Sequence, residues 1–122
     1  DGMTERKLQH QQAMNLSQQA AAALSRGDEQ LAEALFQQAF ELEQKAALTF
    51  LYDFENEPTR SVMFRSAASL ALQCGKWRAA EKLAAMGLSG NPPAEIADEL
   101  RDLFEKVSAE RRTEMAQTAQ LI

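Results

Sequence analysis

The sequence is poor in the residues that most often carry chemistry, with one cysteine and one histidine in 122 residues. A lone cysteine, Cys74, can form neither an intramolecular disulfide nor a thiolate metal cage, and we interpret it as a small packing residue. A lone histidine, His10, provides neither a metal-binding cluster nor the positioned base that nucleophilic catalysis needs. We therefore expect no metal, no cofactor and no enzymatic activity, and a reducing, cytoplasmic location.

Long apolar runs are also missing. No stretch approaches the ~18 apolar residues of a membrane span, and the polar residues 1–10 contain no apolar signal core. The five glycines are scattered, and none follows a predicted strand, so no phosphate-binding loop is indicated. These absences disfavour a membrane protein, an exported protein and a nucleotide-binding enzyme.

The residues that are abundant favour helices. Ala, Leu, Gln and Glu dominate, and this length suits one domain, residues 1–122. We predict an all-α fold of about five antiparallel helices. They span about residues 4–25, 28–53, 59–74 and 76–88, with a last helix from about residue 93 whose apolar stripe thins beyond Arg111. The tail, residues 113–122, is either a frayed extension or a segment that a partner orders.

Two glycines, Gly27 and Gly75, each separate a pair of predicted helices. Glycine adopts the left-handed conformation that ends helices at little cost. Asp28 follows the first glycine and can cap the next helix through its side chain. Ala32 and Ala80 lie shortly after the two glycines, and such small residues let paired helices cross closely. The pattern therefore predicts two helix–turn–helix units.

These two units resemble the tetratricopeptide repeat (TPR), in which small and bulky residues alternate at set positions around a Gly turn. The matching residues are Leu16, Ala20, Gly27, Ala32, Phe36 and Ala39 in the first unit, about residues 13–46, and Phe64, Ala68, Gly75, Trp77, Ala80 and Pro92 in the second, about residues 61–93. The two glycines are 48 residues apart, whereas consecutive repeats are spaced by about 34. We assign the additional residues to a long second helix.

The resemblance implies right-handed stacking of the helical pairs and a C-terminal capping helix, about residues 94–118, as in small uncharacterised bacterial TPR-like proteins. It also implies a concave groove, lined by the first helix of each pair, that binds a peptide or protein. The polar residues expected to line this groove are Asn15, Gln18, Arg60, Arg65, Ser69 and Gln73. Arg65 is the residue expected to hold a carboxylate of the ligand, although both arginines could instead pair with acids of the preceding helix.

Charge is distributed unevenly along the chain, whose net charge is −5. Residues 28–57 contain eight acidic residues and one basic residue, whereas residues 58–92 contain five basic residues and one acidic residue. Either the two segments offset each other in solvated pairs, or the basic segment is an electropositive patch. The basic residues are Arg60, Arg65, Lys76, Arg78 and Lys82. The acidic total disfavours nucleic acid as a partner of this patch.

The end of the long second helix is strongly apolar. Its large residues are Leu48, Phe50, Leu51, Tyr52 and Phe54. They cover more than one helical face, so they either pack against later helices or form a contact between two copies of the chain. The sequence thus predicts a non-catalytic protein–protein interaction module, with a structural homodimer or regulatory subunit that uses this apolar end as the alternative.

Overall fold

The computed structural model describes residues 2–120, with side chains from residue 4 onward, and this part of the chain is all-helical. Its helices are α1 (Gly2–Ser25), α2 (Glu29–Leu48), α3 (Thr59–Gln73), α4 (Trp77–Leu88) and α5 (Ala94–Gln120). Within residues 2–120 no helix is both long enough and apolar enough to cross a membrane. The predicted all-α fold class is confirmed.

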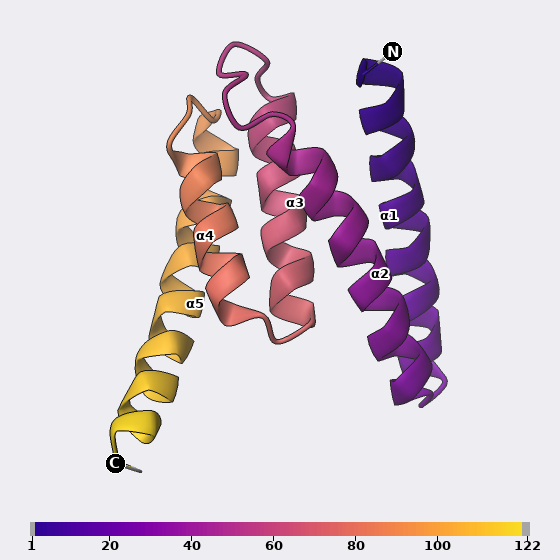
Figure 1. Cartoon of the computed structure of the whole chain (residues 1–122), viewed down its shortest axis with the longest axis vertical. Coiled ribbons are helices and arrows are strands. Elements are labelled where there is room, and N and C mark those ends of the chain that lie inside the picture. Colours follow the sequence, from indigo (N-terminus) through magenta and orange to yellow (C-terminus); the bar gives the residue numbers. More distant parts are fainter. Residues whose placement is uncertain (1, 121–122) are drawn as a thin grey trace.

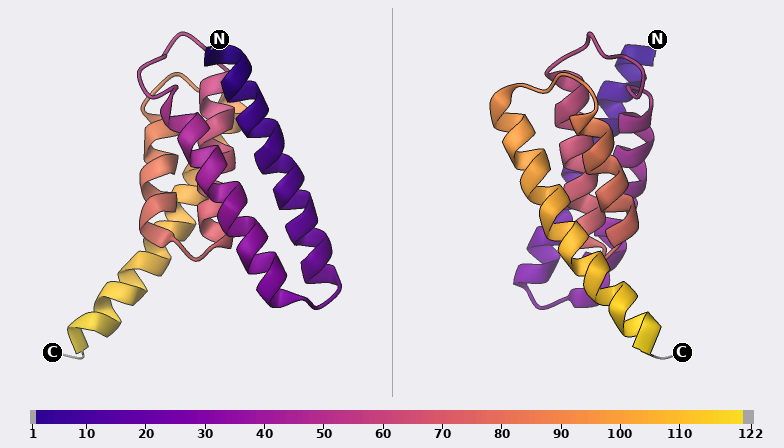
Figure 2. Two further views of the ribbon diagram at one scale, coloured as in Figure 1. Left: turned by 45° about the vertical axis from the view of Figure 1, so that its right-hand side comes forward. Right: turned by 90° about the vertical axis from the view of Figure 1, so that its left-hand side faces the viewer.

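The chain runs down α1, up α2, down α3, up α4 and down α5 in the view of Figure 1. Close packing joins α1 to α2, α3 to α4, and α5 to both α4 and α3, while α2 packs on α3. Figure 2 shows the α1–α2 pair and the C-terminal end of α5 spreading apart below the α3–α4 pair. Helix α3 is therefore the central element, because three other helices rest on it.

Both predicted glycine bends are present. Gly27 has φ +82° and Gly75 has φ +68°, the left-handed conformation that favours glycine. The Asp28 side chain accepts a hydrogen bond from the Leu31 backbone N–H at 3.2 Å and caps α2 as predicted. Ala32 is only 2% exposed and Ala80 is fully buried. Both alanines are therefore buried as predicted, each in the second helix of a closely packed pair.

Helix α2 is shorter than predicted: it ends at Leu48 rather than near Asp53. The next residues form tight turns instead, because the side chain of Arg60 takes carbonyl groups that a longer helix would use itself. Its Nε donates to the Phe50 carbonyl at 3.1 Å and its Nη2 to the Leu51 carbonyl at 3.0 Å. The prediction that the helix continues to about residue 53 is therefore wrong.

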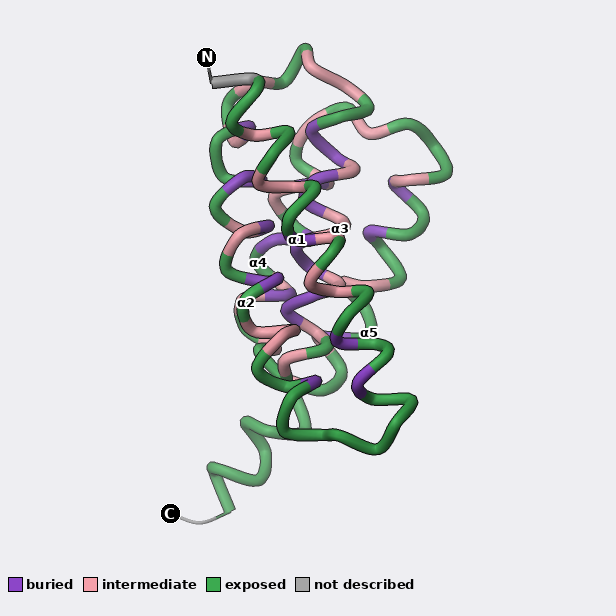
Figure 3. Tube along the Cα trace, turned by 90° about the vertical axis from the view of Figure 1, so that its right-hand side faces the viewer, coloured by how far each residue is buried: buried purple, intermediate pink, exposed green. Residues whose placement is uncertain are grey.

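Small residues make α3 the centre of the core. Ala67, Ala68 and Ala71 are fully buried on it, together with Phe64. A Cβ added at Gly87 of α4 would lie 3.0 Å from the Phe64 Cβ, so α4 crosses α3 very closely. The buried positions in Figure 3 gather where the helices meet and are absent from the end of α5.

The last part of α5 projects from the body. The helix continues to Gln120, but every described side chain beyond Arg111 is exposed. The predicted tail is thus an exposed helical extension as far as residue 120, while its final residues, 121–122, lie outside the described residues.

Candidate functional site

The residues predicted to line a groove between the first helices do not share one cavity. Asn15 and Gln18 are exposed on α1, whereas Arg65 and Ser69 are half-buried and Gln73 is exposed on α3. Helices α1 and α3 are not among the closely packed pairs. Of these five residues, only Gln73 lines one of the larger cavities, beside the Gly75 bend.

Arg60, the sixth predicted groove residue, is fully buried, so its guanidinium cannot meet a ligand. Besides its two bonds to the turn after α2, its Nη1 donates to the Gly87 carbonyl at 3.4 Å. Its guanidinium carbon lies 4.7 Å from the ring centroid of Phe54 and 5.0 Å from that of Phe64. Burial lowers the pKa of Arg60, and the carboxylates of Glu57 and Asp53 oppose that shift. Arg60 fastens the turn to α3 and α4, and its assignment to a groove was wrong.

Arg65 is engaged inside the molecule. Its Nη1 donates to Oε2 of Glu99, a residue of α5, at 2.8 Å. Both side chains keep contact with solvent, which makes this a surface ion pair of small energetic value. The alternative anticipated from the sequence, a pair with an acid of the second helix, is replaced by a pair with the last helix.

The apolar end of the second predicted helix is divided by the turn that replaces it. Phe50 is 2% exposed and belongs to the core, and Leu51 is half-buried. Tyr52 is 83% exposed, and Leu48 and Phe54 are about half as exposed. Three of the five predicted self-association residues therefore remain accessible.

A wide open groove lies between the second helices of the two pairs, and we name it the α2–α4 groove. It arises because α2 and α4 both pack on α3 without packing closely on each other. Its volume is about 590 Å³. The lining residues are Gln44 and Leu48 of α2, Gly75 and Lys76 of the bend, Trp77, Arg78, Ala79, Lys82, Leu83 and Met86 of α4, and Glu114 of α5.

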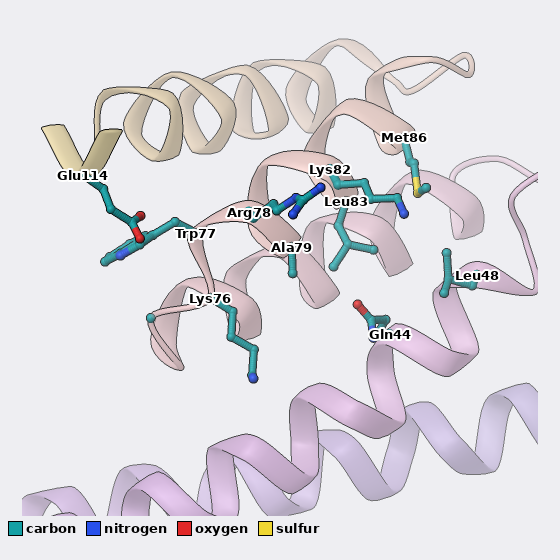
Figure 4. Close-up of a pocket in the computed structure, with 11 residues that line it drawn as sticks. Gln44, Leu48, Lys76, Trp77, Arg78, Ala79, Lys82, Leu83, Met86 and Glu114 are labelled. Atoms are coloured by element: carbon teal, nitrogen blue, oxygen red, sulfur yellow. The ribbon is translucent and has the colours of Figure 1, made fainter. Parts of the chain in front are cut away.

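The floor of the α2–α4 groove is apolar. Figure 4 shows Ala79 and Leu83 pointing from α4 into the space toward α2, with Leu48 and Gln44 on the opposite side. Leu83 is almost fully buried, whereas Leu48 is 40% exposed and available to another molecule. Trp77, the single tryptophan of the chain, lies toward the same end of the groove as Glu114 of α5.

The rim of the groove is basic. Lys76, Arg78 and Lys82 are all exposed, and none of the three forms an ion pair within residues 2–120. Lys76 lies 5.8 Å from the ring centroid of Phe40, a distant cation–π contact. The three cations therefore remain available to a negatively charged partner.

The acid of α4, Glu81, does not neutralise these cations, because it is occupied elsewhere. Its carboxylate accepts hydrogen bonds from Arg111 at 2.6 Å and from Ser108 at 2.9 Å, both on α5. Burial acts to raise the pKa of Glu81, but these hydrogen bonds outweigh it and the pKa lies below its ordinary value. Glu81 thus holds α5 against α4 and leaves the groove basic.

A buried acid–histidine pair, not anticipated from the sequence, joins α1 to α2. Glu43 is fully buried, and its Oε2 lies 2.7 Å from Nδ1 of His10, while its Oε1 has no hydrogen-bond partner within the described residues. Burial raises the pKa of Glu43, and His10 and Ser66 oppose that shift. One sequence signal was present: Glu43 lies four residues after Ala39 and three before Ala46, on the buried stripe of α2.

A second cavity, of about 320 Å³, lies near this pair, between the starts of α1 and α3. Its lining is mostly apolar, with Phe50 and Met63 among the buried members. Two of its basic residues face carboxylates, since Arg6 lies 3.9 Å from Asp53 and His10 contacts Glu43, and Lys7 is the one basic lining residue without an ion pair among residues 4–120. This cavity therefore offers a ligand less available charge than the α2–α4 groove.

Reactive groups are scarce in the described part of the chain. Residues 2–120 contain no group of three or more His, Cys, Asp or Glu side chains placed to hold a metal ion. Burial raises the pKa of the Cys74 thiol, with a smaller opposing effect from Lys76, so the thiolate is disfavoured. Comparison of the chain with protein-family models, with curated proteins and with solved structures finds no match.

Proposed function

We propose that this chain is a non-catalytic, TPR-like protein-interaction module whose partner docks in the α2–α4 groove. The observation that carries the proposal is the pairing of an apolar floor with a rim of three exposed cations that form no ion pair with any described side chain, residues 4–120. An apolar centre with a polar rim is the usual anatomy of a protein-binding surface.

The size and the chemistry of the groove support binding rather than catalysis. A volume of about 590 Å³ lies in the range of roughly 300 to 1,000 Å³ that is usual for binding sites. The titratable groups that line it are Lys76, Arg78, Lys82 and Glu114, all of them exposed. None is a histidine or a cysteine, the side chains that most often act as general base or nucleophile in catalysis.

The proposed class of function is the one that the sequence indicates, but the proposed binding surface is a different one. The sequence favoured the first helices of the two pairs, α1 and α3, whereas the open groove lies between their second helices. The glycine bends at Gly27 and Gly75 and the alanines buried at both crossings support the TPR-like design.

A homodimer is the second candidate, favoured by the exposure of Leu48, Tyr52 and Phe54. Leu48 also lines the α2–α4 groove, so a second copy could occupy the same surface. Light scattering over a concentration series separates the two functions. A monomer at every concentration would exclude the homodimer, and a tight dimer that dissociates when Leu48 is changed to Glu would support it.

Filling the groove tests the proposed function. Ala79 lines the groove, and Ala85, on the same helix, is exposed and lines none of the cavities described above. Random peptides displayed on phage would be selected on the wild-type chain and then tested on the Ala79→Trp variant and on the control Ala85→Trp. We expect the selected peptides to lose binding to Ala79→Trp and to keep it with Ala85→Trp. Equal binding to both variants would refute the groove as the docking site.

A further inference from the structure

We infer that the occupant of the α2–α4 groove is an acidic protein segment that carries apolar anchor side chains, an inference that rests on the proposed function. Three features of the groove point to this occupant: its unpaired positive charges, its apolar floor and its length.

Folding leaves only some of the basic residues accessible to a partner. Of the five in residues 58–92, Arg60 is buried and Arg65 is paired with Glu99. The three that remain, Lys76, Arg78 and Lys82, all line the α2–α4 groove, whose one acidic lining residue is Glu114. An excess of positive charge at this groove, on a chain of net charge −5, attracts an acidic segment and repels a basic one.

The apolar floor of the groove indicates that its occupant carries apolar side chains as well as charge. Ala79, Leu83, Met86 and Leu48 present aliphatic surface, part of which is exposed to water in the free chain. Covering it removes apolar area from water, which is the main favourable term in protein association. An apolar side chain such as leucine, flanked by carboxylates, satisfies both the floor and the rim.

Nucleic acid fits this groove less well than an acidic peptide. Phosphate groups could meet the three cations, but they would leave the aliphatic floor uncovered. Single strands bind through several aromatic platforms and a long basic track, whereas Trp77 is the one aromatic residue of the lining.

The groove extends along α4 from Lys76 to Met86, which at a rise of ~1.5 Å per residue is a length of about 15 Å. Between two and three turns of a partner helix span that distance. Anchors at positions i, i+3 or i+4, and i+7 of such a helix would therefore face the floor.

Three fluorescein-labelled synthetic peptides of equal length separate the contributions of charge and apolar anchors. The first places leucine on one helical face and glutamate on the other, the second replaces leucine by alanine, and the third replaces glutamate by lysine. Fluorescence anisotropy measures their binding to the full chain. We expect the glutamate–leucine peptide to bind, and the other two to bind at least about tenfold more weakly.

Charge-reversed variants locate the charge effect. Lys82→Glu should weaken binding of the glutamate–leucine peptide about tenfold, because it replaces an attraction by a repulsion of similar size. Lys106→Glu changes the net charge equally, at an exposed position on α5 that lines none of the cavities described above, and should have little effect. Higher salt should weaken binding to the wild type more than binding to Lys82→Glu.

The outcomes distinguish this inference from the proposed function. Tighter binding of the lysine–leucine peptide, or equal binding of both leucine peptides, with loss in Ala79→Trp, would overturn the acidic occupant and leave the groove as the docking site. If no peptide shows binding that the Ala79→Trp substitution abolishes, both the acidic occupant and the groove as the docking site are overturned. Tighter binding of a single-stranded DNA oligonucleotide than of the glutamate–leucine peptide, with loss in Lys82→Glu, would overturn the peptide in favour of nucleic acid.

Discussion

Replacing Arg60 by Met is expected to destabilise the fold by about 3 kcal/mol. Methionine keeps a long unbranched side chain but removes the guanidinium that joins the turn after α2 to α3 and α4. Three hydrogen bonds from a charged donor are lost, in a site from which water is excluded. Hydrogen bonds of this kind contribute about 1.5 to 3 kcal/mol each.

The value of about 3 kcal/mol lies below the sum of three such hydrogen bonds because two of the acceptors keep another partner. The Phe50 carbonyl also accepts from the Asp53 backbone N–H at 3.0 Å, and the Gly87 carbonyl from Gly90 at 3.5 Å. The Leu51 carbonyl has Arg60 as its donor within the described residues. Most of the loss therefore comes from one orphaned carbonyl and from the open packing between the flanking rings.

Urea unfolding followed by circular dichroism measures this change. With a slope of about 1.5 kcal/mol per molar urea, the midpoint of Arg60→Met should fall by about 2 M. Arg65→Met is the matched control, on the same helix but in a surface pair with Glu99, and should cost at most about 1 kcal/mol. Equal midpoints for the two variants would refute the view that Arg60 holds the turn in place.

Substitutions at three further positions test other parts of the structure. Burial raises the pKa of Glu43 above 4.5, so the contribution of Glu43 to stability is complete below pH 4.5 and is lost as pH rises through its folded-state pKa. Urea midpoints should therefore fall with rising pH more steeply in the wild type than in Glu43→Gln. Parallel curves for the two proteins would contradict this. Gly75→Ala should lower the free energy of unfolding by about 1 kcal/mol, because φ is +68° there although no atom obstructs a Cβ. Gly75→Asn should lower it less. A thermal melt that is unchanged in Gly75→Ala would count against the left-handed bend. Gly90→Ala should cost about 1 to 3 kcal/mol, since its Cβ would collide with the Arg60 guanidinium, and this cost should largely disappear when measured in the Arg60→Met background.

Local sequence chemistry was sufficient to predict the helical bends. The first bend depends on residues that lie close together in the chain: Gly27 with its positive φ, the capping Asp28 and the buried Ala32. The second bend, at Gly75 and Ala80, follows the same logic apart from the side-chain cap, which Lys76 does not provide. The helix boundaries there agree with the prediction within one or two residues.

The end of the second helix could not be predicted in this way. Apolar periodicity continues to Phe54, so the pattern predicts a helix that extends beyond the true end at Leu48. The turn exists because Arg60, some ten residues further on, reaches back to the carbonyls of Phe50 and Leu51. No local pattern distinguishes an arginine that will be buried in this manner from one that faces solvent.

The location of the groove has a similar explanation. Helical periodicity shows which face of a helix is polar, but it does not show which two helices leave a space between them. That space follows from α2 and α4 both resting on α3. Lys76, Arg78 and Lys82 belong to a basic stretch of the sequence. The sequence does not show that these three line one cavity whereas Arg60 and Arg65 do not.

The most direct test of the central claim is to map the bound peptide by nuclear magnetic resonance. The glutamate–leucine peptide would be titrated into the ¹⁵N-labelled full chain, with the single Trp77 indole N–H as an internal reporter. We expect shifts in that signal and in the amides of Leu48, Lys82 and Leu83, on the two sides of the groove. Shifts confined to the α1 and α3 residues that the sequence first suggested, such as Gln18 and Ser69, would contradict it.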